Sequence, residues 1–144
     1  MKLTFKVQAQ SENPTKTVVK ARNFEVIVDE PKNLGGTDEG ANPVEYVLAA
    51  LAGCLNVMSH VIAKEMNMPL TGVTIDLEGD LDPAKFMGKS TEARAGYQEI
   101  RVKITPDTTA DSETLAKWLH AVETRCPVSD NLQNATPVSI TLGE

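Results

Sequence analysis

Five short segments of the chain alternate apolar and polar residues, which is the period of a half-buried β-strand, and a sixth, 17–20, also reads as a strand. In the first of them Leu3, Phe5 and Val7 share one side, and mostly polar neighbours share the other. The segments with a strand pattern are 2–10, 17–20, 24–28, 73–78, 100–104 and 138–142. We therefore predict six strands, each with one buried face.

A long helix is predicted between the third and the fourth of these strands. Asn42 can cap its start, Pro43 suits the first helical position, and Glu45 can bond back to the cap amide. The helical segment continues to about Asn67, just before Pro69. At 1.5 Å per residue such a helix measures roughly 37 Å, about the width of a domain of this size.

The predicted helix is apolar on nearly all of its sides. Between Val47 and Ala63 the only polar residues are Asn56, Ser59 and His60. A helix of this kind must be buried on nearly all sides, and its apolar run is too short and too interrupted for a membrane span. One sheet face and one further helix cannot cover it, so we expect a second copy of the chain to do so, in a homodimer.

A second, amphipathic helix is predicted over 111–125, where apolar residues recur at helical spacing. Cys126 ends it, because a residue before proline is pushed out of the α region, and Pro127 can begin a short helical turn through Leu132. The resulting order βββ-α-ββ-α-β predicts an α+β fold with antiparallel strands and helices on one face of the sheet. We expect one domain over 1–144.

Composition narrows the classes of function. The 144 residues include 14 basic and 20 acidic side chains, which gives a net charge of −6, and 41% are hydrophobic. These values are ordinary for a globular protein, and the acidic balance argues against electrostatic binding of nucleic acid. Only two cysteines are present and no signal peptide opens the chain, so we expect a reducing, cytoplasmic setting.

Two incomplete ligand motifs argue against a cofactor. A Gly-Lys-Ser triplet at 88–90 imitates the end of a phosphate-binding loop, but Pro83 stands where that loop needs glycine. The cysteine and histidine pairs with a spacing of six residues are Cys54 with His60 and His120 with Cys126. Six residues turn a helix by about 240°, so neither pair shares a face and we expect no metal site.

The two thiols remain as either core residues or redox groups. Cys126 lies before Pro127 at a predicted helix start, where backbone amides favour a thiolate, and Arg125 adjoins it. Cys54 lies inside the apolar helix, where burial raises the pKa of a thiol. From the local sequence alone, Cys126 is the better candidate for a thiolate and Cys54 is more often a core residue.

The sequence Asn-Pro-Val-Glu-Tyr-Val-Leu-Ala-Ala-Leu-Ala-Gly-Cys at 42–54, with Cys-Pro-Val-Ser at 126–129, resembles the OsmC/Ohr family. Its members are the osmotically inducible and organic hydroperoxide resistance proteins, and the resemblance covers the whole chain in element order and length. It implies an intertwined homodimer with long central helices packed between strands of both chains. It also implies a cysteine-based peroxidase with sites at the dimer interface.

Carried onto this chain, the resemblance makes Cys54 the peroxidatic thiolate and Cys126 the resolving thiol. Attack on a hydroperoxide turns the first thiolate into a sulfenic acid, the second thiol converts it to a disulfide, and an external dithiol reduces that disulfide. An apolar pocket beside Cys54 favours organic hydroperoxides over hydrogen peroxide. This chemistry needs no cofactor.

The chain departs from the family pattern at its glutamate. Well-understood members carry glutamate directly after the proline of the helix start, whereas here Val44 takes that position and the acid is Glu45. Nine residues correspond to about 180° of rotation and roughly 13 Å of rise, so Glu45 cannot touch its own Cys54 on a straight helix. It either acts from the partner chain or serves only as a cap, and we favour the cap.

A second departure concerns the arginine that activates the thiolate in those members. The loop 31–41 contains no arginine, so Arg22 is the candidate replacement and Arg125 the other. The missing arginine motivates an alternative function, a non-catalytic dimer that senses oxidation or binds a small apolar ligand. A third reading is a structural domain with two inert thiols.

Overall fold

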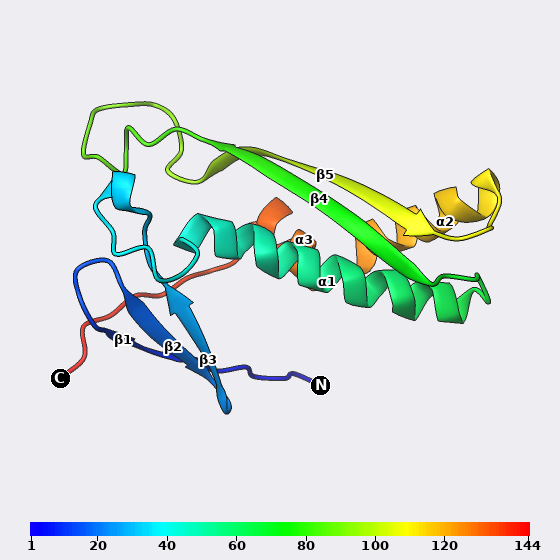
Figure 1. Cartoon of the computed structure of the whole chain (residues 1–144), viewed down its shortest axis with the longest axis horizontal. Helices are drawn as coiled ribbons and strands as arrows, with labels where there is room; N and C mark the ends of the chain where they lie inside the picture. Colours follow the sequence, from blue (N-terminus) through cyan, green and yellow to red (C-terminus); the bar gives the residue numbers. More distant parts are fainter. The chain divides into compact units, whose positions relative to one another are not determined.

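The computed structural model describes all 144 residues, and their contacts group into two compact units, Met1–Ala49 and Ala50–Glu144. The order of strands and helices is β1–β2–β3–α1–β4–β5–α2–α3, with one 3₁₀ turn, η1 (Lys32–Leu34), before α1 (Figure 1). The fold is α+β with antiparallel sheets, as predicted. The assignment of 1–144 to a single domain stays a prediction, and the two units are described separately below.

A three-stranded antiparallel sheet in the order β1–β2–β3 forms most of the first unit. Strands β2 (Thr17–Ala21) and β3 (Phe24–Val28) pair along their whole length, which confirms the strands predicted over 17–20 and 24–28. Arg22 turns the chain between them with a left-handed backbone (φ 58°), as a two-residue hairpin connection requires.

The first predicted strand is only partly formed. Strand β1 (Gln8–Ser11) pairs with β2, whereas residues 2–7 form no strand. A strand needs a neighbour to receive its backbone hydrogen bonds, and the register of β2 provides one only from Gln8 onward. The apolar residues of the unpaired segment, Leu3, Phe5 and Val7, are exposed.

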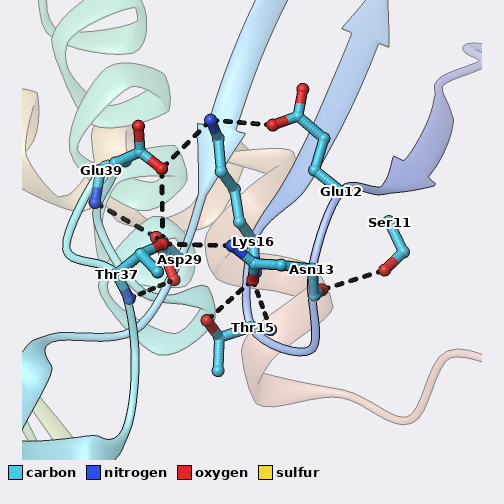
Figure 2. A network of polar contacts seen from close by, with 8 residues as sticks. All are labelled: Ser11, Glu12, Asn13, Thr15, Lys16, Asp29, Thr37 and Glu39. Atoms are coloured by element: carbon cyan, nitrogen blue, oxygen red, sulfur yellow. Dashed lines mark hydrogen bonds and ion pairs between the residues drawn. The ribbon is translucent and has the colours of Figure 1, made fainter.

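A buried carboxylate organises the loop that follows β3. Asp29 is fully buried and accepts a hydrogen bond from the N–H of Glu30 (2.7 Å). It also accepts hydrogen bonds from the N–H groups of Thr37 (3.4 Å) and Glu39 (3.2 Å) and from the Thr37 hydroxyl (Figure 2). Burial alone would raise the pKa of Asp29, but hydrogen bonds led by Thr37 outweigh it and hold that pKa well below its usual range. Asp29 is therefore a charged anchor that needs no contacting cation.

The same network reaches the hairpin between β1 and β2. Lys16 forms ion pairs with Glu12 (2.8 Å) and Glu39 (3.2 Å), and the Asn13 side chain accepts hydrogen bonds from the N–H groups of Thr15 and Lys16. Asn13 also donates to the Thr37 hydroxyl across 3.3 Å. These contacts tie the hairpin to the loop (Figure 2).

Helix α1 (Pro43–Glu65) begins as predicted. The Glu45 N–H donates to the Asn42 side chain (2.9 Å), and the Asn42 N–H donates to the Glu45 carboxylate (2.8 Å), which confirms the capping interaction. The Tyr46 hydroxyl donates to the carbonyl of Ile27 across 2.6 Å and so holds the helix start against β3. Helix α1 ends two residues before the predicted Asn67, which adopts a left-handed backbone (φ 52°).

Within the second unit, one side of α1 is buried and the other is exposed. Its buried residues are Leu51, Leu55, Ser59, Ile62 and Ala63. Val57 and Val61, on the opposite side, are 57% and 41% exposed, so the all-round burial expected for this helix is not reached within one chain. By length and composition α1 could cross a membrane, with 28% of its most apolar window buried, yet a buried stripe of this kind is typical of a core helix.

An antiparallel pair of long strands and two helices complete the second unit. Strands β4 (Gly72–Leu81) and β5 (Tyr97–Asp107) lie side by side (Figure 1), and their apolar residues pack against the core of this unit. Helix α2 (Ser112–Arg125) buries Trp118 and Val122. Helix α3 (Pro127–Gln133) follows it directly. The strands predicted over 73–78 and 100–104 and the helix over 111–125 are therefore confirmed.

The prediction of a last strand over 138–142 is wrong for the isolated chain. Residues 138–142 form no strand, and their apolar residues Val138, Ile140 and Leu142 are exposed. The alternating pattern is present, but no strand of the chain pairs with it, and an unpaired extended segment leaves its backbone groups to water.

Candidate functional site

Two thiols that are 72 residues apart in the sequence meet in the second unit. The Sγ atoms of Cys54 and Cys126 lie 2.9 Å apart in a thiol–thiol hydrogen bond, and both cysteines are free. Cys54 is half-buried, whereas Cys126 is only 1% exposed. The structure thus brings together two of the four residues predicted for the site.

Each thiol comes from a different kind of element. Cys54 lies within α1 and packs against a core cluster that includes its neighbours Leu51 and Leu55. Cys126 lies at the junction of α2 and α3, with an extended backbone (φ −78°, ψ 113°), as expected for a residue before Pro127. Its sulfur caps α3 by accepting the N–H of Ser129 across 3.4 Å, and the predicted helix start at this cysteine is confirmed.

The surroundings of Cys54 favour its protonated form. Burial raises the pKa of the Cys54 thiol, and the hydrogen bond shared with the Cys126 thiol raises it further. The backbone N–H of Val128 opposes both effects through a hydrogen bond to the Cys54 sulfur. Cys54 is therefore mostly a thiol at neutral pH, and the thiolate is its minor form.

Each candidate arginine contacts another group within its own unit. The guanidinium of Arg125 binds the carboxylate of Glu65 through two contacts of 2.6 and 3.0 Å, so its charge is compensated there. Arg22 lies in the hairpin of the first unit, with its guanidinium 5.1 Å from the ring centroid of Phe24. The role of Arg22 in thiolate activation stays a prediction.

Glu45 uses its carboxylate at the start of α1. The hydrogen bond from the Asn42 N–H to this carboxylate accounts for the acid at this position by helix capping alone. A catalytic role of Glu45 in a partner's site stays a prediction.

Two other kinds of ligand site, a metal site and a surface pocket, can be compared with the thiol pair. No three His, Cys, Asp or Glu side chains form a group that could hold a metal ion. A surface hollow of about 400 Å³ lies in the first unit and is lined mostly by polar residues, among them Gln8, Gln10, Lys20 and Glu25. The thiol pair is therefore the candidate site of this protein.

Sequence reasoning missed two groups beside the thiols. No sequence signal points to Glu65, because its partner Arg125 is 60 positions away in the sequence and no local pattern links them. The N–H of Val128 belongs to the quoted motif at 126–129, but every residue type except proline carries such a group, so the sequence holds no signal for its contact with Cys54.

Comparison with known proteins identifies the fold. The sequence profile of the family described as OsmC-like protein matches residues 36–141. A search of the curated proteins found no match. The OsmC-like protein from Mycoplasma pneumoniae has a similar structure, with a TM-score of 0.80 and 19% identity over 92% of this chain and 89% of that one.

Two structures of proteins named for organic hydroperoxide resistance are also similar. The protein from Legionella pneumophila has a TM-score of 0.64 and 19% identity over 91% of this chain and 90% of its own. The protein from Elizabethkingia anophelis has a TM-score of 0.63 and 20% identity over 90% of this chain and 89% of its own. The profile match spans most of the chain, including both cysteines, and the α+β fold agrees with it, so this chain belongs to the OsmC-like protein family.

Proposed function

We propose that this protein is a thiol-dependent peroxidase that reduces organic hydroperoxides through Cys54 and Cys126. The observation that carries the proposal is the 2.9 Å contact between the two sulfurs. Membership of the OsmC-like family supports it, as do similar structures named for organic hydroperoxide resistance.

The proposed reaction has three steps. The Cys54 thiolate attacks the O–O bond of the hydroperoxide, takes up one oxygen as a sulfenic acid, and releases the alcohol once a proton is added. The Cys126 thiol then attacks the Cys54 sulfur, forms a disulfide, and releases water. An external dithiol reduces the disulfide by thiol–disulfide exchange and is itself oxidised.

The apolar surroundings of Cys54 support an organic substrate. Cys54 packs against a cluster that includes Leu51, Leu55 and Val122, and no charged side chain is bonded to its sulfur. Such surroundings bind an alkyl or aryl group by the hydrophobic effect, whereas hydrogen peroxide gains nothing from them.

We also propose that the working form is an intertwined homodimer. The exposed side of α1 carries Val57 and Val61, and both chain ends carry exposed apolar residues at strand spacing. Apolar surface of this extent marks a protein interface. A second copy of the chain could cover the helix face and pair with the free strand edges.

Intact mass after one equivalent of cumene hydroperoxide tests the proposal. The expected product has lost two hydrogens, and peptide mapping should place the link between Cys54 and Cys126. With a dithiol as donor, Cys54→Ser should abolish peroxide consumption, while Cys126→Ser should stop at a sulfenic or sulfinic product on Cys54. Retained activity in Cys54→Ser would overturn the proposal.

One observation favours the alternative function, a redox sensor or a carrier of small apolar ligands. The raised pKa of Cys54 makes its thiolate scarce, and a scarce thiolate reacts slowly with peroxide. Under this alternative the purified protein holds an apolar molecule, or forms the disulfide without catalytic turnover. Steady-state consumption of hydroperoxide with a dithiol donor separates the two functions.

A further inference from the structure

Arg125 and Glu65 form a two-armed ion pair. Its Nη1–Oε2 distance is 2.6 Å and its Nη2–Oε1 distance is 3.0 Å. Two parallel bonds between a planar guanidinium and a planar carboxylate fix direction as well as distance. Hydrogen bonding within the pair lowers the pKa of Glu65 and raises the pKa of Arg125. The pair thus joins the last residue of α1 to the last residue of α2 while both groups are charged.

The ion pair lies next to the thiol pair in the chain. Cys126 directly follows Arg125, and its sulfur touches that of Cys54 in α1. Farther back in α2, the indole N–H of Trp118 donates to the carbonyl of Ser59 across 3.0 Å. Three polar contacts therefore connect α1 with α2 and with Cys126, which follows α2. Of these, the ion pair holds the last turn of α2, directly before Cys126.

That last turn needs such a contact. A helix end has carbonyl groups without intrahelical partners and tends to fray, and Cys126 has already left the helical conformation. The position of the Cys126 sulfur thus depends on what holds the end of α2, as well as on its burial and its hydrogen bond from the N–H of Ser129. We propose that Glu65, through Arg125, is a positioning residue that keeps the Cys126 thiol within reach of Cys54.

This role rests on the proposed peroxidase function and concerns its second step. In that step the Cys54 sulfenic acid and the Cys126 thiol give a disulfide and one water. A competing step consumes a second hydroperoxide, which gives a Cys54 sulfinic acid and an alcohol. Loosening Cys126 lowers its effective concentration at Cys54. This slows disulfide formation but not the competing oxidation to sulfinic acid. The attack of Cys54 on the first hydroperoxide is not slowed, because a looser Cys126 thiol weakens the hydrogen bond that raises the pKa of Cys54.

Glu65→Gln tests the proposal, because it keeps the shape of the side chain and removes its charge. We expect the Cys54 sulfenic acid to form at least as fast as in the wild type, disulfide formation to slow about three- to tenfold, and more sulfinic acid to form in excess cumene hydroperoxide. Quenched-flow samples read by intact mass give all three quantities. Glu113→Gln is the matched control, since it breaks another ion pair of α2, with Lys117 at 3.2 Å, and should change none of them.

The charge-swapped double variant Glu65→Arg with Arg125→Glu rebuilds the pair and should restore most of the lost rate. Two results would overturn the positioning role. One is a Glu65→Gln variant that forms disulfide and sulfinic acid in the same proportion as the wild type, and the other is a folded double variant that does not restore the rate of disulfide formation. Circular dichroism and thermal melting establish that each variant folds.

A second readout does not depend on peroxidase activity. The equilibrium of thiol–disulfide exchange with an oxidised small dithiol also depends on how close the Cys54 and Cys126 thiols lie. Glu65→Gln should lower the equilibrium constant for forming the Cys54–Cys126 disulfide at least threefold. If the wild type does not react with hydroperoxide, the proposed function fails while this equilibrium still decides the role of Glu65. An unchanged equilibrium constant would overturn that role.

Discussion

At the scale of single residues, the chemistry of Cys54 depends on the balance of burial and hydrogen bonding at its sulfur. Burial and the Cys126 thiol favour the neutral form, and the N–H of Val128 favours the thiolate. The sequence has no arginine in the loop 31–41, and Arg125 is bound to Glu65. In the peroxidase that we propose, the reactivity of Cys54 therefore comes from a small population of thiolate.

A rising pH profile follows from this balance. Since the pKa of Cys54 lies above its ordinary value of 9.0, the thiolate fraction grows about tenfold per pH unit throughout the neutral range. Single-turnover oxidation of Cys54 by cumene hydroperoxide should rise from pH 6 to pH 9 without a plateau when it is measured in Cys126→Ser, where burial, the larger cause, still raises the pKa of Cys54. A plateau below pH 7 would contradict the raised pKa.

The buried charge of Asp29 predicts a loss of stability in acid. Its pKa is lower in the folded than in the unfolded protein, so its contribution is present above the unfolded pKa, near pH 4, and is lost as pH falls below it. We expect Asp29→Asn to lower the free energy of unfolding at pH 7 and to make it less dependent on pH between 5 and 2. Urea unfolding at several pH values measures both effects.

Asp38→Asn is the matched control for this prediction. Asp38 lies in the same loop but is exposed and has a left-handed backbone (φ 59°), which asparagine tolerates well. An equal change of stability and of its pH dependence in both variants would show that the loop does not depend on the Asp29 charge.

At the scale of elements, the capping interaction at the start of α1 separates structural from catalytic roles. Asn42 and Glu45 satisfy each other's N–H groups, and the start of the helix is further held by the bond from Tyr46 to β3. Glutamine at the third helical position can make the same cap as glutamate, so the charge and the cap can be tested one at a time.

Two substitutions carry out this test. Glu45→Gln should leave both stability and peroxide consumption unchanged, because the cap persists without the charge. Asn42→Ala removes the cap and should cost about 1 kcal/mol of stability in urea unfolding. Loss of peroxidase activity in a stable Glu45→Gln variant would instead assign the carboxylate a role in the partner's site.

At the scale of the whole molecule, much apolar surface remains uncovered in one chain. The exposed large hydrophobic residues include Val57 and Val61 on α1, and apolar residues at both termini. A monomer with this surface would associate, because the hydrophobic effect scales with the apolar area removed from water. The homodimer that we propose accounts for it.

Charges on the exposed face of α1 should separate such a dimer. Light scattering should give the wild type a mass of about twice the 15.6 kDa of one chain, and Val57→Asp with Val61→Asp should shift it towards that of the monomer. Leu119→Asp is the control, since Leu119 is exposed on α2 beside the exposed His120. A dimer that survives the double substitution would place the interface elsewhere.

Local signals in the sequence predicted most elements of this fold. Asn42, Pro43 and Glu45 marked the start of α1 to the residue, and Pro127 marked the boundary between α2 and α3, because caps and prolines act on the backbone beside them. The strands at 2–10 and 138–142 were predicted from equally good alternation, yet in the single chain the first forms only from Gln8 onward and the second does not form. Alternation of apolar and polar residues indicates that a segment has a face that can be buried. A strand forms only where a second strand pairs with that segment in register.

For the candidate site, the sequence by itself determined which side chains are available: two thiols, a cap for α1, and no arginine in the loop 31–41. The family resemblance then suggested that Cys54 and Cys126 act together. Only the tertiary structure decided that their sulfurs touch, that Arg125 pairs with Glu65, and that Asp29 is a buried anchor. Contacts between residues 60 or 72 positions apart arise from the packing of whole elements, and no local stretch of sequence encodes that packing.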